Sequence, residues 1–316
     1  MRYLTKIILT LCSLILLMEV ASAQSKQQYL YAVKGADSLY LDHYVAPVSG
    51  ERPCMVFLFG GGFVGGTRDN KDYLPYFEML TRNGIDVVSI DYRLGLRSLK
   101  TMQSMPDMRT TITMLNNAVN IAVEDLYSAT LFILENAKQW NINTKAILTS
   151  GSSAGAITVL QAENGICNRT TAAAVLPQGF RYAGVISYAG AIFSVNGKPK
   201  WGTQPAPTMF FHGSADRQVP YEKATMFGIG FYGPKYLVKE YEKEQWAHWF
   251  YDIEYHTHAI SMLPMYENHN EILTFIKEYV LKRREIMKTT TVKDKSLGVQ
   301  PTKFKVKDYI KANFGQ

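Results

Sequence analysis

Cysteine is scarce in this chain. Three cysteines occur in 316 residues. Cys12 lies in an apolar segment near the N-terminus, which leaves Cys54 and Cys167 in the body of the protein. One pair cannot make the framework of a small disulfide-stapled domain. We expect two unpaired thiols and a fold that depends on a hydrophobic core.

Long apolar runs are also few. Residues 7–18 are apolar, follow two basic residues and precede Ala21-Ser22-Ala23, a cleavage signal. The run is too short to span a membrane comfortably, so residues 1–23 are predicted to be a secretory signal peptide. No lipid anchor is expected at Cys12, and no other segment is apolar enough to be transmembrane. The mature protein is therefore predicted to be exported, to the periplasm or the extracellular space.

The body of the chain lacks a strong excess of either charge. The formal net charge is +7. The predicted signal peptide contributes +1, from two basic residues and one acidic, and residues 289–316 contribute +4, from six lysines and two aspartates. The remainder is close to neutral, which argues against a nucleic-acid-binding face. Residues 289–316 are predicted to be a solvated, lysine-rich C-terminal tail.

No internal repeat or linker interrupts the chain, and segments of strand length alternate with segments of helix length. This alternation predicts an α/β fold with a doubly wound, mostly parallel, eight-stranded sheet. The expected strands cover residues 29–33, 39–45, 55–59, 87–91, a run that ends near 150, 183–188, 208–212 and 249–255. Helices are expected over 73–82, 114–136, after 153, and over 271–284.

One α/β domain is expected over residues 24–288, with a small insertion at about 94–113. That segment is irregular and contains Met102, Met105 and Met108. Methionine side chains are flexible and apolar. The segment is therefore predicted to be a lid over the site, and a surface loop is the alternative.

A Gly-x-Ser-x-Gly motif occurs in Ile147-Leu148-Thr149-Ser150-Gly151-Ser152-Ser153-Ala154-Gly155-Ala156, between an apolar run and a helical pattern. This order is typical of a nucleophile elbow, a sharp strand-to-helix turn that exposes a serine above the sheet. The glycines would let strand and helix pass closely. The motif predicts Ser153 as a nucleophile.

A nucleophilic serine needs a general base and an acid that orients the base. Asp216 follows an expected strand, so it would lie at the carboxyl edge of the sheet together with the elbow. Its alternative role is to cap a helix that Pro220 begins. His258 and His256 both follow the last expected strand. His258 is favoured as the base because it lies further into the loop, and His256 is the alternative.

The other histidines are less well placed. His43 lies in the N-terminal hairpin and is expected to be exposed. His212 ends a strand directly before a glycine, which favours a packing role. His248 and His269 lie at the opposite end of the last strand and near the start of the last helix.

A glycine-rich loop follows the third expected strand, with the sequence Phe59-Gly60-Gly61-Gly62-Phe63-Val64-Gly65-Gly66. Glycines allow backbone N–H groups to turn toward a developing oxyanion. The amides of Gly61, Gly62 and Ala154 are predicted to form an oxyanion hole.

Together these motifs resemble the hormone-sensitive-lipase-like carboxylesterases of the α/β-hydrolase superfamily, with xylan acetyl and feruloyl esterase-type members as the most similar. The resemblance runs from about residue 50 to 283. It is carried by Phe59-Gly-Gly-Gly-Phe, Asp91-Tyr92-Arg93-Leu94, the Gly-x-Ser-x-Gly motif and His212-Gly-x-x-Asp216-x-x-Val-Pro220. It implies the same nucleophile, acid, base and oxyanion hole, and a structural role for Asp91-Tyr92-Arg93. The family usually has histidine where this chain has Phe59, so packing would have to hold the glycine loop.

The resemblance implies an exported serine carboxylesterase that hydrolyses short acyl esters, acetyl among them, on a small molecule or a carbohydrate. No metal or organic cofactor is implied. A serine peptidase of the same fold and a non-catalytic binding protein of that fold are the alternatives.

The sequence also contains weaker patterns for two other kinds of site, a dinucleotide-binding site and a metal site. Gly60-x-Gly62-x-x-Gly65 matches part of a dinucleotide-binding motif, but no helix pattern follows it directly. His256-x-His258 beside Asp252 and Glu254 has the spacing of metal ligands on one strand face. Both patterns leave the elbow and Asp216 unexplained.

Overall fold

The computed structural model describes residues 26–102, 104, 106–302 and 304. The predicted signal peptide and the end of the predicted tail lie outside these residues. In the part of the chain that is described, no helix has the length and apolar character needed to cross a membrane.

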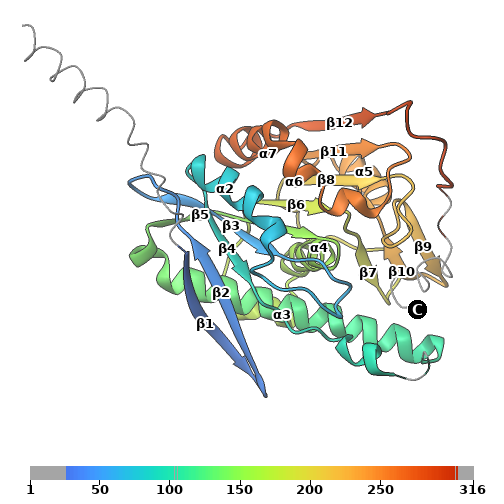
Figure 1. Ribbon diagram of the computed structural model, residues 1–316, viewed down its shortest axis with the longest axis horizontal. Helices are drawn as coiled ribbons and strands as arrows, with labels where there is room; N and C mark the ends of the chain where they lie inside the picture. The colour runs from blue at the N-terminus through green and yellow to red at the C-terminus, as the bar shows by residue number, and fades with distance from the viewer. Residues whose placement is uncertain (1–25, 103, 105, 303, 305–316) are drawn as a thin grey trace, which may run out of the picture.

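Nine strands form one large sheet, in the order β1-β2-β4-β3-β5-β6-β8-β11-β12 (Figure 1). The first two neighbouring pairs are antiparallel, and every later pair is parallel. The expected doubly wound, mostly parallel sheet is therefore confirmed, with nine strands rather than eight. The strands are β1 (Lys26–Lys34), β2 (Asp37–Tyr44), β3 (Arg52–Leu58), β4 (Asp86–Ile90), β5 (Ile142–Ser152), β6 (Gly184–Tyr188), β8 (Thr208–Gly213), β11 (His248–Ile253) and β12 (Met287–Val292).

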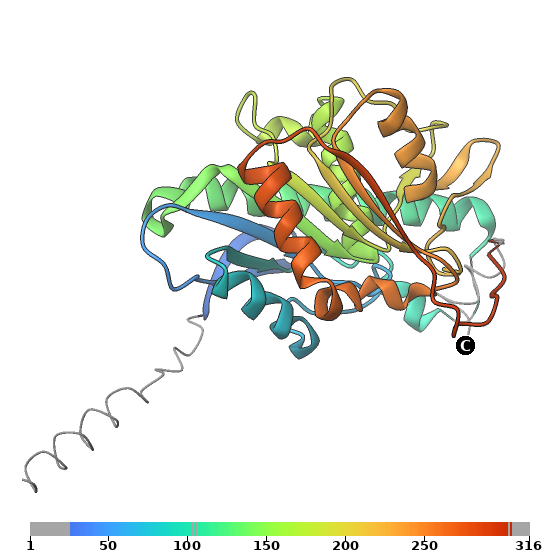
Figure 2. The same ribbon diagram turned by 90° about the horizontal axis from the view of Figure 1, so that it is seen from above.

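Helices cover both faces of this sheet. Figure 2 shows α2 and α7 on one face and α3, α4 and α5 on the other. The helices are α2 (Leu74–Arg82), α3 (Met108–Trp140), α4 (Ala154–Cys167), α5 (Pro234–Lys243), α6 (Pro264–Glu267) and α7 (His269–Phe275). Shorter helical turns are η1 (Lys71–Tyr73), η2 (Arg97–Thr101), η3 (Thr171–Val175), η4 (His258–Ser261) and the π-helical η5 (Ile276–Leu281).

A small antiparallel sheet lies beside the large one and was not predicted. Its strands are β7 (Ile192–Ser194), β9 (Lys223–Met226) and β10 (Ile229–Tyr232), in the order β7-β10-β9. These strands are three or four residues long, and so short a segment carries little periodic signal.

The hydrophobic core lies between the sheet and its helical layers. Residues 54–58 of β3 and 87–90 of β4 are fully buried, as expected of parallel strands covered on both faces. Cys54 and Cys167 are buried and unpaired.

His43 is buried, which contradicts the expected exposure. It is only 2% exposed, and its Nε2 lies 2.8 Å from Oδ2 of Asp86. Arg52 donates to the same carboxylate over 2.7 Å. The expectation failed because β2 pairs with β4 as well as with β1, so the second strand of the hairpin lies inside the sheet.

The predicted lid is a short connection between β4 and α3. Helix α3 begins at Met108, within the expected insertion, and η2 fills part of the rest. The amide of Leu96 donates to the carbonyl of Phe63 over 3.0 Å, so the connection packs on the glycine loop. Met102 and Met108 are 44% and 46% exposed and do not form the expected apolar wall. Met105 lies outside the described residues.

Strand β12 is the ninth strand, and it crosses the expected boundary between domain and tail at residue 288. It pairs in parallel with β11 along its whole length. Nε1 of Trp249 donates to Oγ1 of Thr290 over 3.0 Å, and Nζ of Lys288 lies 3.9 Å from the centroid of a Trp249 ring. The domain therefore extends at least to Val292.

Shortening the chain tests this boundary. A chain that ends at residue 288 removes four of the six residues of β12 and should lose about 2 kcal/mol of stability from the missing ladder hydrogen bonds. For a domain of this size, that loss lowers Tm by about 4–8 °C. A chain that ends at residue 292 keeps the strand and is the matched control. Equal Tm values for the two shortened chains in a thermal unfolding scan would contradict the edge-strand role.

Candidate active site

Ser153 occupies the turn between β5 and α4 in a conformation that few non-glycine residues adopt. Its φ is 51° and its ψ is −113°. Such strained geometry persists only where the surrounding structure enforces it. The amide of Ser153 donates to the carbonyl of Tyr188 over 2.9 Å, which ties the turn to the end of β6.

Two glycines make the turn sterically possible. A Cβ atom at Gly151 would overlap the backbone of Gly155, and a Cβ atom at Gly155 would overlap the carbonyl of Leu58 at the end of β3. The helix thus approaches both strands more closely than a side chain allows. This is the steric role that the Gly-x-Ser-x-Gly pattern predicts.

Ser153, His258 and Asp216 form a continuous hydrogen-bonded chain. Nε2 of His258 lies 2.8 Å from Oγ of Ser153, and its Nδ1 lies 2.7 Å from Oδ2 of Asp216. The three residues follow β5, β11 and β8, whose carboxyl ends share one edge of the sheet. Both ring nitrogens are therefore engaged, one by the hydroxyl and the other by the carboxylate. This is the arrangement in which imidazole can take a proton from serine.

Asp216 is held by its own turn as well as by histidine. The carboxyl group is buried, with the residue 2% exposed, and Oδ1 accepts the amides of Gln218 and Val219 over 2.8 and 2.9 Å. Pro220 begins no helix among the described residues, so the predicted alternative role of helix cap is wrong. Burial alone would raise the pKa of Asp216, but the charges and hydrogen bonds of His258 and His212 outweigh burial and lower this pKa far below its usual range.

The contact between His212 and Asp216 was not predicted from the sequence. The ring of His212 is fully buried, and Nε2 lies 3.1 Å from the carbonyl oxygen of Val219 and 3.4 Å from Oδ2 of Asp216. The residue was expected only to pack. Its position four residues before Asp216, across the same turn, was the available signal.

His256 supports the site through its backbone. Its carbonyl accepts the amide of Ala215 over 2.9 Å, and a Cβ atom at Gly213 would overlap that carbonyl. The structure thus brings His258, rather than His256, to Ser153. Among the described residues, no cluster of three or more His, Cys, Asp or Glu side chains could hold a metal ion.

Packing and two tyrosines hold the glycine loop where Phe59 replaces the usual histidine. The Phe59 ring stacks on Tyr92 with centroids 4.5 Å apart, and the Tyr92 hydroxyl donates to the carbonyl of Phe59 over 2.8 Å. The amide of Gly60 donates to the Tyr73 hydroxyl over 3.0 Å. A Cβ atom at Gly60 would lie 3.3 Å from Cβ of Ser153, so the loop passes directly beside the elbow.

The predicted oxyanion-hole amides are available near Ser153. Gly61 and Gly62 have φ values of 132° and 62°, which favour glycine. Among the described residues, their amides have no hydrogen-bond acceptor. Ala154 is the first residue of α4, where amides have no acceptor within the helix. Ala154 adjoins Ser153 in the chain, and Gly61 and Gly62 directly follow Gly60, so the oxyanion hole stays a prediction that these free amides support.

Asp91-Tyr92-Arg93 lies behind the glycine loop. Arg68 donates to Asp91 over 2.7 Å, and Arg93 pairs with the buried Asp125 over 2.8 Å. These ion pairs hold the end of β4 against the loop and α3, in keeping with a structural role.

Part of this chain is similar in sequence to known esterases. The sequence model of the Carboxylesterase family matches residues 17–162. Esterase B1 of Culex pipiens is 30% identical over 125 residues, which are 39% of this chain and 21% of that protein. Acetylcholinesterase of Bungarus fasciatus is 30% identical over 124 residues, 39% of this chain and 19% of that protein. The matched part spans about a fifth of the length of these curated relatives.

Solved structures of an esterase match most of this chain. The apo form of Thermogutta terrifontis esterase 2 superposes with a TM-score of 0.58 at 18% identity, over 83% of this chain and 96% of that one. The chain has the α/β-hydrolase fold. The butyrate-bound form of the same esterase gives a TM-score of 0.59 over 83% of this chain and 95% of that one, again at 18% identity.

Tyr73 provides a test of how the glycine loop is held. Replacing Tyr73 by Phe removes the acceptor for the Gly60 amide and should lower kcat about tenfold through a misplaced oxyanion hole. Tyr76→Phe is the matched control, because Tyr76 is a buried tyrosine whose hydroxyl bonds Tyr188 instead of the loop. Steady-state hydrolysis of an aryl acetate gives kcat for each of the two variants. An equal effect of the two substitutions would show that Tyr73 does not position the loop.

The lowered pKa of Asp216 predicts a pH-dependent contribution to the free energy of unfolding. Because folding lowers its pKa, the ionised carboxylate stabilises the folded state by on the order of 2 kcal/mol at neutral pH. This contribution is complete above the ordinary carboxyl pKa of about 4 and is lost as the pH falls below it. Asp216→Asn should therefore have a lower free energy of unfolding than the wild type at pH 7. The difference between the two should become smaller as the pH falls below about 4. Denaturant unfolding of both proteins measures this difference. A difference that stays constant between pH 7 and pH 2 would contradict a lowered pKa for Asp216.

Proposed function

We propose that this chain is a serine carboxylesterase that hydrolyses short-acyl esters through an acyl-enzyme on Ser153. The observation that carries the proposal is the hydrogen-bonded chain from Ser153 through His258 to Asp216. The α/β-hydrolase fold supports it, as do the amides of Gly61, Gly62 and Ala154, which have no acceptor among the described residues.

The reaction follows from this geometry. His258 takes the proton of Ser153 as Oγ attacks the ester carbonyl, and Asp216 stabilises the imidazolium and fixes its orientation. The amides of Gly61, Gly62 and Ala154 bind the oxyanion of the tetrahedral intermediate. His258 then gives its proton to the departing alcohol, and water releases the acyl group by the reverse sequence of steps.

The finer assignments extend the proposal. A small acyl group is supported by the propionate- and butyrate-bound structures of Thermogutta terrifontis esterase 2. We propose acetyl or a similar acyl group on a small alcohol or a carbohydrate. We also propose export, because residues 1–23 have the pattern of a signal peptide. The hormone-sensitive-lipase-like subtype stays a prediction.

Hydrolysis of a short-chain aryl acetate tests the proposed reaction. Wild type should turn the ester over, and Ser153→Ala should lose at least about 10³-fold in kcat. His258→Ala should lose a similar factor. His256→Ala keeps the backbone carbonyl that accepts the amide of Ala215, so it should stay within about threefold of wild type.

Covalent labelling separates a narrow substrate range from a missing nucleophile. Paraoxon phosphorylates Thermogutta terrifontis esterase 2, and here it should add one phosphoryl group at Ser153, detected by peptide mass spectrometry. Wild type that neither hydrolyses the acetate nor takes the label would contradict the proposed function.

A further inference from the structure

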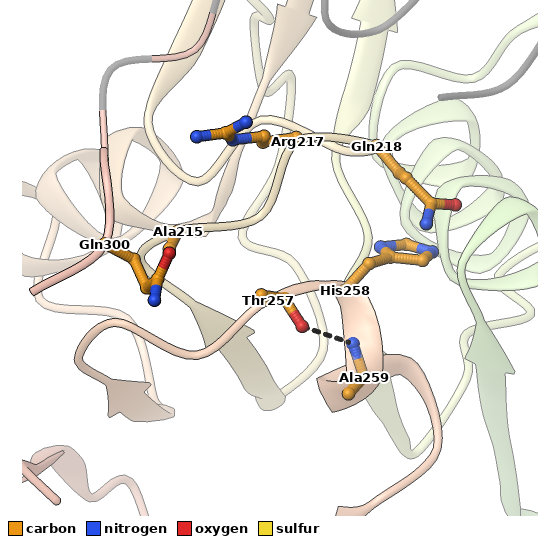
Figure 3. A pocket seen from close by; sticks show the side chains of 7 residues that line it. All are labelled: Ala215, Arg217, Gln218, Thr257, His258, Ala259 and Gln300. Atoms are coloured by element: carbon orange, nitrogen blue, oxygen red, sulfur yellow. Dashed lines mark hydrogen bonds between the residues drawn. The ribbon is translucent and has the colours of Figure 1, made fainter. Parts of the chain in front are cut away.

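A second feature adjoins the triad on the side of His258. A pocket of about 540 Å³ lies between the turn that carries Asp216, the turn that carries His258 and a residue from the C-terminal segment (Figure 3). It is lined by Ala215, Arg217 and Gln218, by residues 257–259, and by Gln300. Ser153 and the glycine loop are not among the residues that line it.

The place of this pocket in the reaction follows from which groups it touches. The oxyanion faces the glycine loop and the start of α4, whereas the departing alcohol oxygen faces His258, which gives it a proton. A pocket that reaches His258 without reaching the glycine loop therefore lies on the alcohol side of the ester.

Arg217 is the one permanent charge among the described residues that line the pocket. It is exposed and forms no hydrogen bond or ion pair with any described residue. The other polar side chains in the lining are those of Gln218, Thr257, His258 and Gln300, and no carboxylate lines the pocket. In Figure 3 the Arg217 guanidinium and Gln300 lie on the left of the view, and the His258 ring lies on the right.

The turn that holds Asp216 also fixes the backbone of Arg217. Oδ1 of Asp216 accepts the amides of the two residues that follow Arg217. These bonds hold the backbone before and after Arg217 in place. The Asp216 carboxylate is buried in the protein, and the Arg217 side chain is exposed. A cation fixed in this way loses little backbone freedom when it binds a charged group.

The C-terminal segment supplies the far wall of the pocket. After β12, Lys293 pairs with Glu254 over 2.9 Å, and Oδ1 of Asp294 accepts the amide of Ser296 over 2.8 Å. Because β12 is parallel to β11, the chain leaves β12 at the carboxyl edge of the sheet. These contacts hold it there, and Gln300 reaches the pocket. The segment was predicted to be a solvated tail.

We propose that this pocket binds the alcohol part of the ester and that Arg217 selects an alcohol part that carries a carboxylate. For a carbohydrate ester, this means an acidic sugar. A guanidinium group binds carboxylates through paired, charge-assisted hydrogen bonds. The inference rests on the proposed esterase function, and it names Arg217 as a specificity residue of that site.

A pair of acetate esters tests the charge preference. 4-Acetoxybenzoate carries a carboxylate on its alcohol part, and methyl 4-acetoxybenzoate is its neutral counterpart. The quantity to measure is the ratio of kcat/KM for the anionic ester to kcat/KM for the neutral one. Comparing this ratio between variants cancels the intrinsic reactivities of the two esters. Arg217→Ala should lower the ratio about tenfold, mainly through KM for the anionic ester, while neutral-ester turnover stays near wild type.

Matched variants separate a local contact from net charge. Arg217→Lys should keep part of the preference, because lysine offers charge without the paired donors. Arg82→Ala removes the same charge from an exposed position on α2 whose partner is Glu78, and should leave the ratio unchanged. Raising the ionic strength should lower the wild-type ratio and leave that of Arg217→Ala nearly constant.

A bulky substitution at the far wall tests where the alcohol lies. Gln300→Trp should lower kcat/KM for both aryl esters about tenfold by filling the pocket, and should leave hydrolysis of methyl acetate unchanged. Equal loss for methyl acetate would place the alcohol elsewhere and overturn the pocket assignment.

The outcomes distinguish the two proposals. Turnover of both aryl esters with the same ratio in wild type and Arg217→Ala would overturn the charge selection and leave the esterase function standing. Absence of turnover for every ester, together with absence of the Ser153 label, would overturn the proposed function and this inference with it.

Discussion

The close approach of strand β3 to helix α4 determines the geometry of the whole site. Gly155 lies against the carbonyl of Leu58 with no room for a side chain, and the glycine loop continues directly from that strand. One backbone contact therefore fixes the elbow that carries Ser153 against the strand that leads into the predicted oxyanion-hole loop. Because backbone atoms make the contact, the alignment of nucleophile and donors does not depend on a flexible side chain. The energetic cost is the strained turn at Ser153, which the packing of three neighbouring strands enforces.

Asp216 is the second fixed point. One carboxylate accepts two amides of its own turn and faces the rings of His212 and His258. An acid with so many partners cannot rotate away, so the imidazole it orients has one stable position. The same turn carries Arg217 into the adjoining pocket. Orientation of the base and presentation of a cation to the alcohol part of an ester are thus two results of a single set of hydrogen bonds.

The parts of the structure that could be predicted from the sequence are those in which local pattern and position along the chain suffice. Ser153, Asp216 and His258 each follow a buried apolar strand, and parallel strands place such residues on one edge. Features that depend on distant partners could not be predicted. His43 is buried because β2 has a neighbour on each side, and β12 is largely polar and is a strand only because β11 offers it an open edge. Phe59 stacks on Tyr92, a partner that follows the next strand in sequence.

The course of the chain after β12 has a consequence for how the protein is made. Gln300 leaves the ribosome after every strand of the sheet, including β12 at its edge. Ser153, Asp216 and His258 all precede it, so a nascent domain can assemble its nucleophile and base while the pocket beside His258 still lacks its last wall. Synthesis proceeds from the N-terminus, so the proposed alcohol pocket is completed later than the proposed catalytic residues. The proposed selectivity of this chain therefore depends on a residue that is made after all of the proposed catalytic residues.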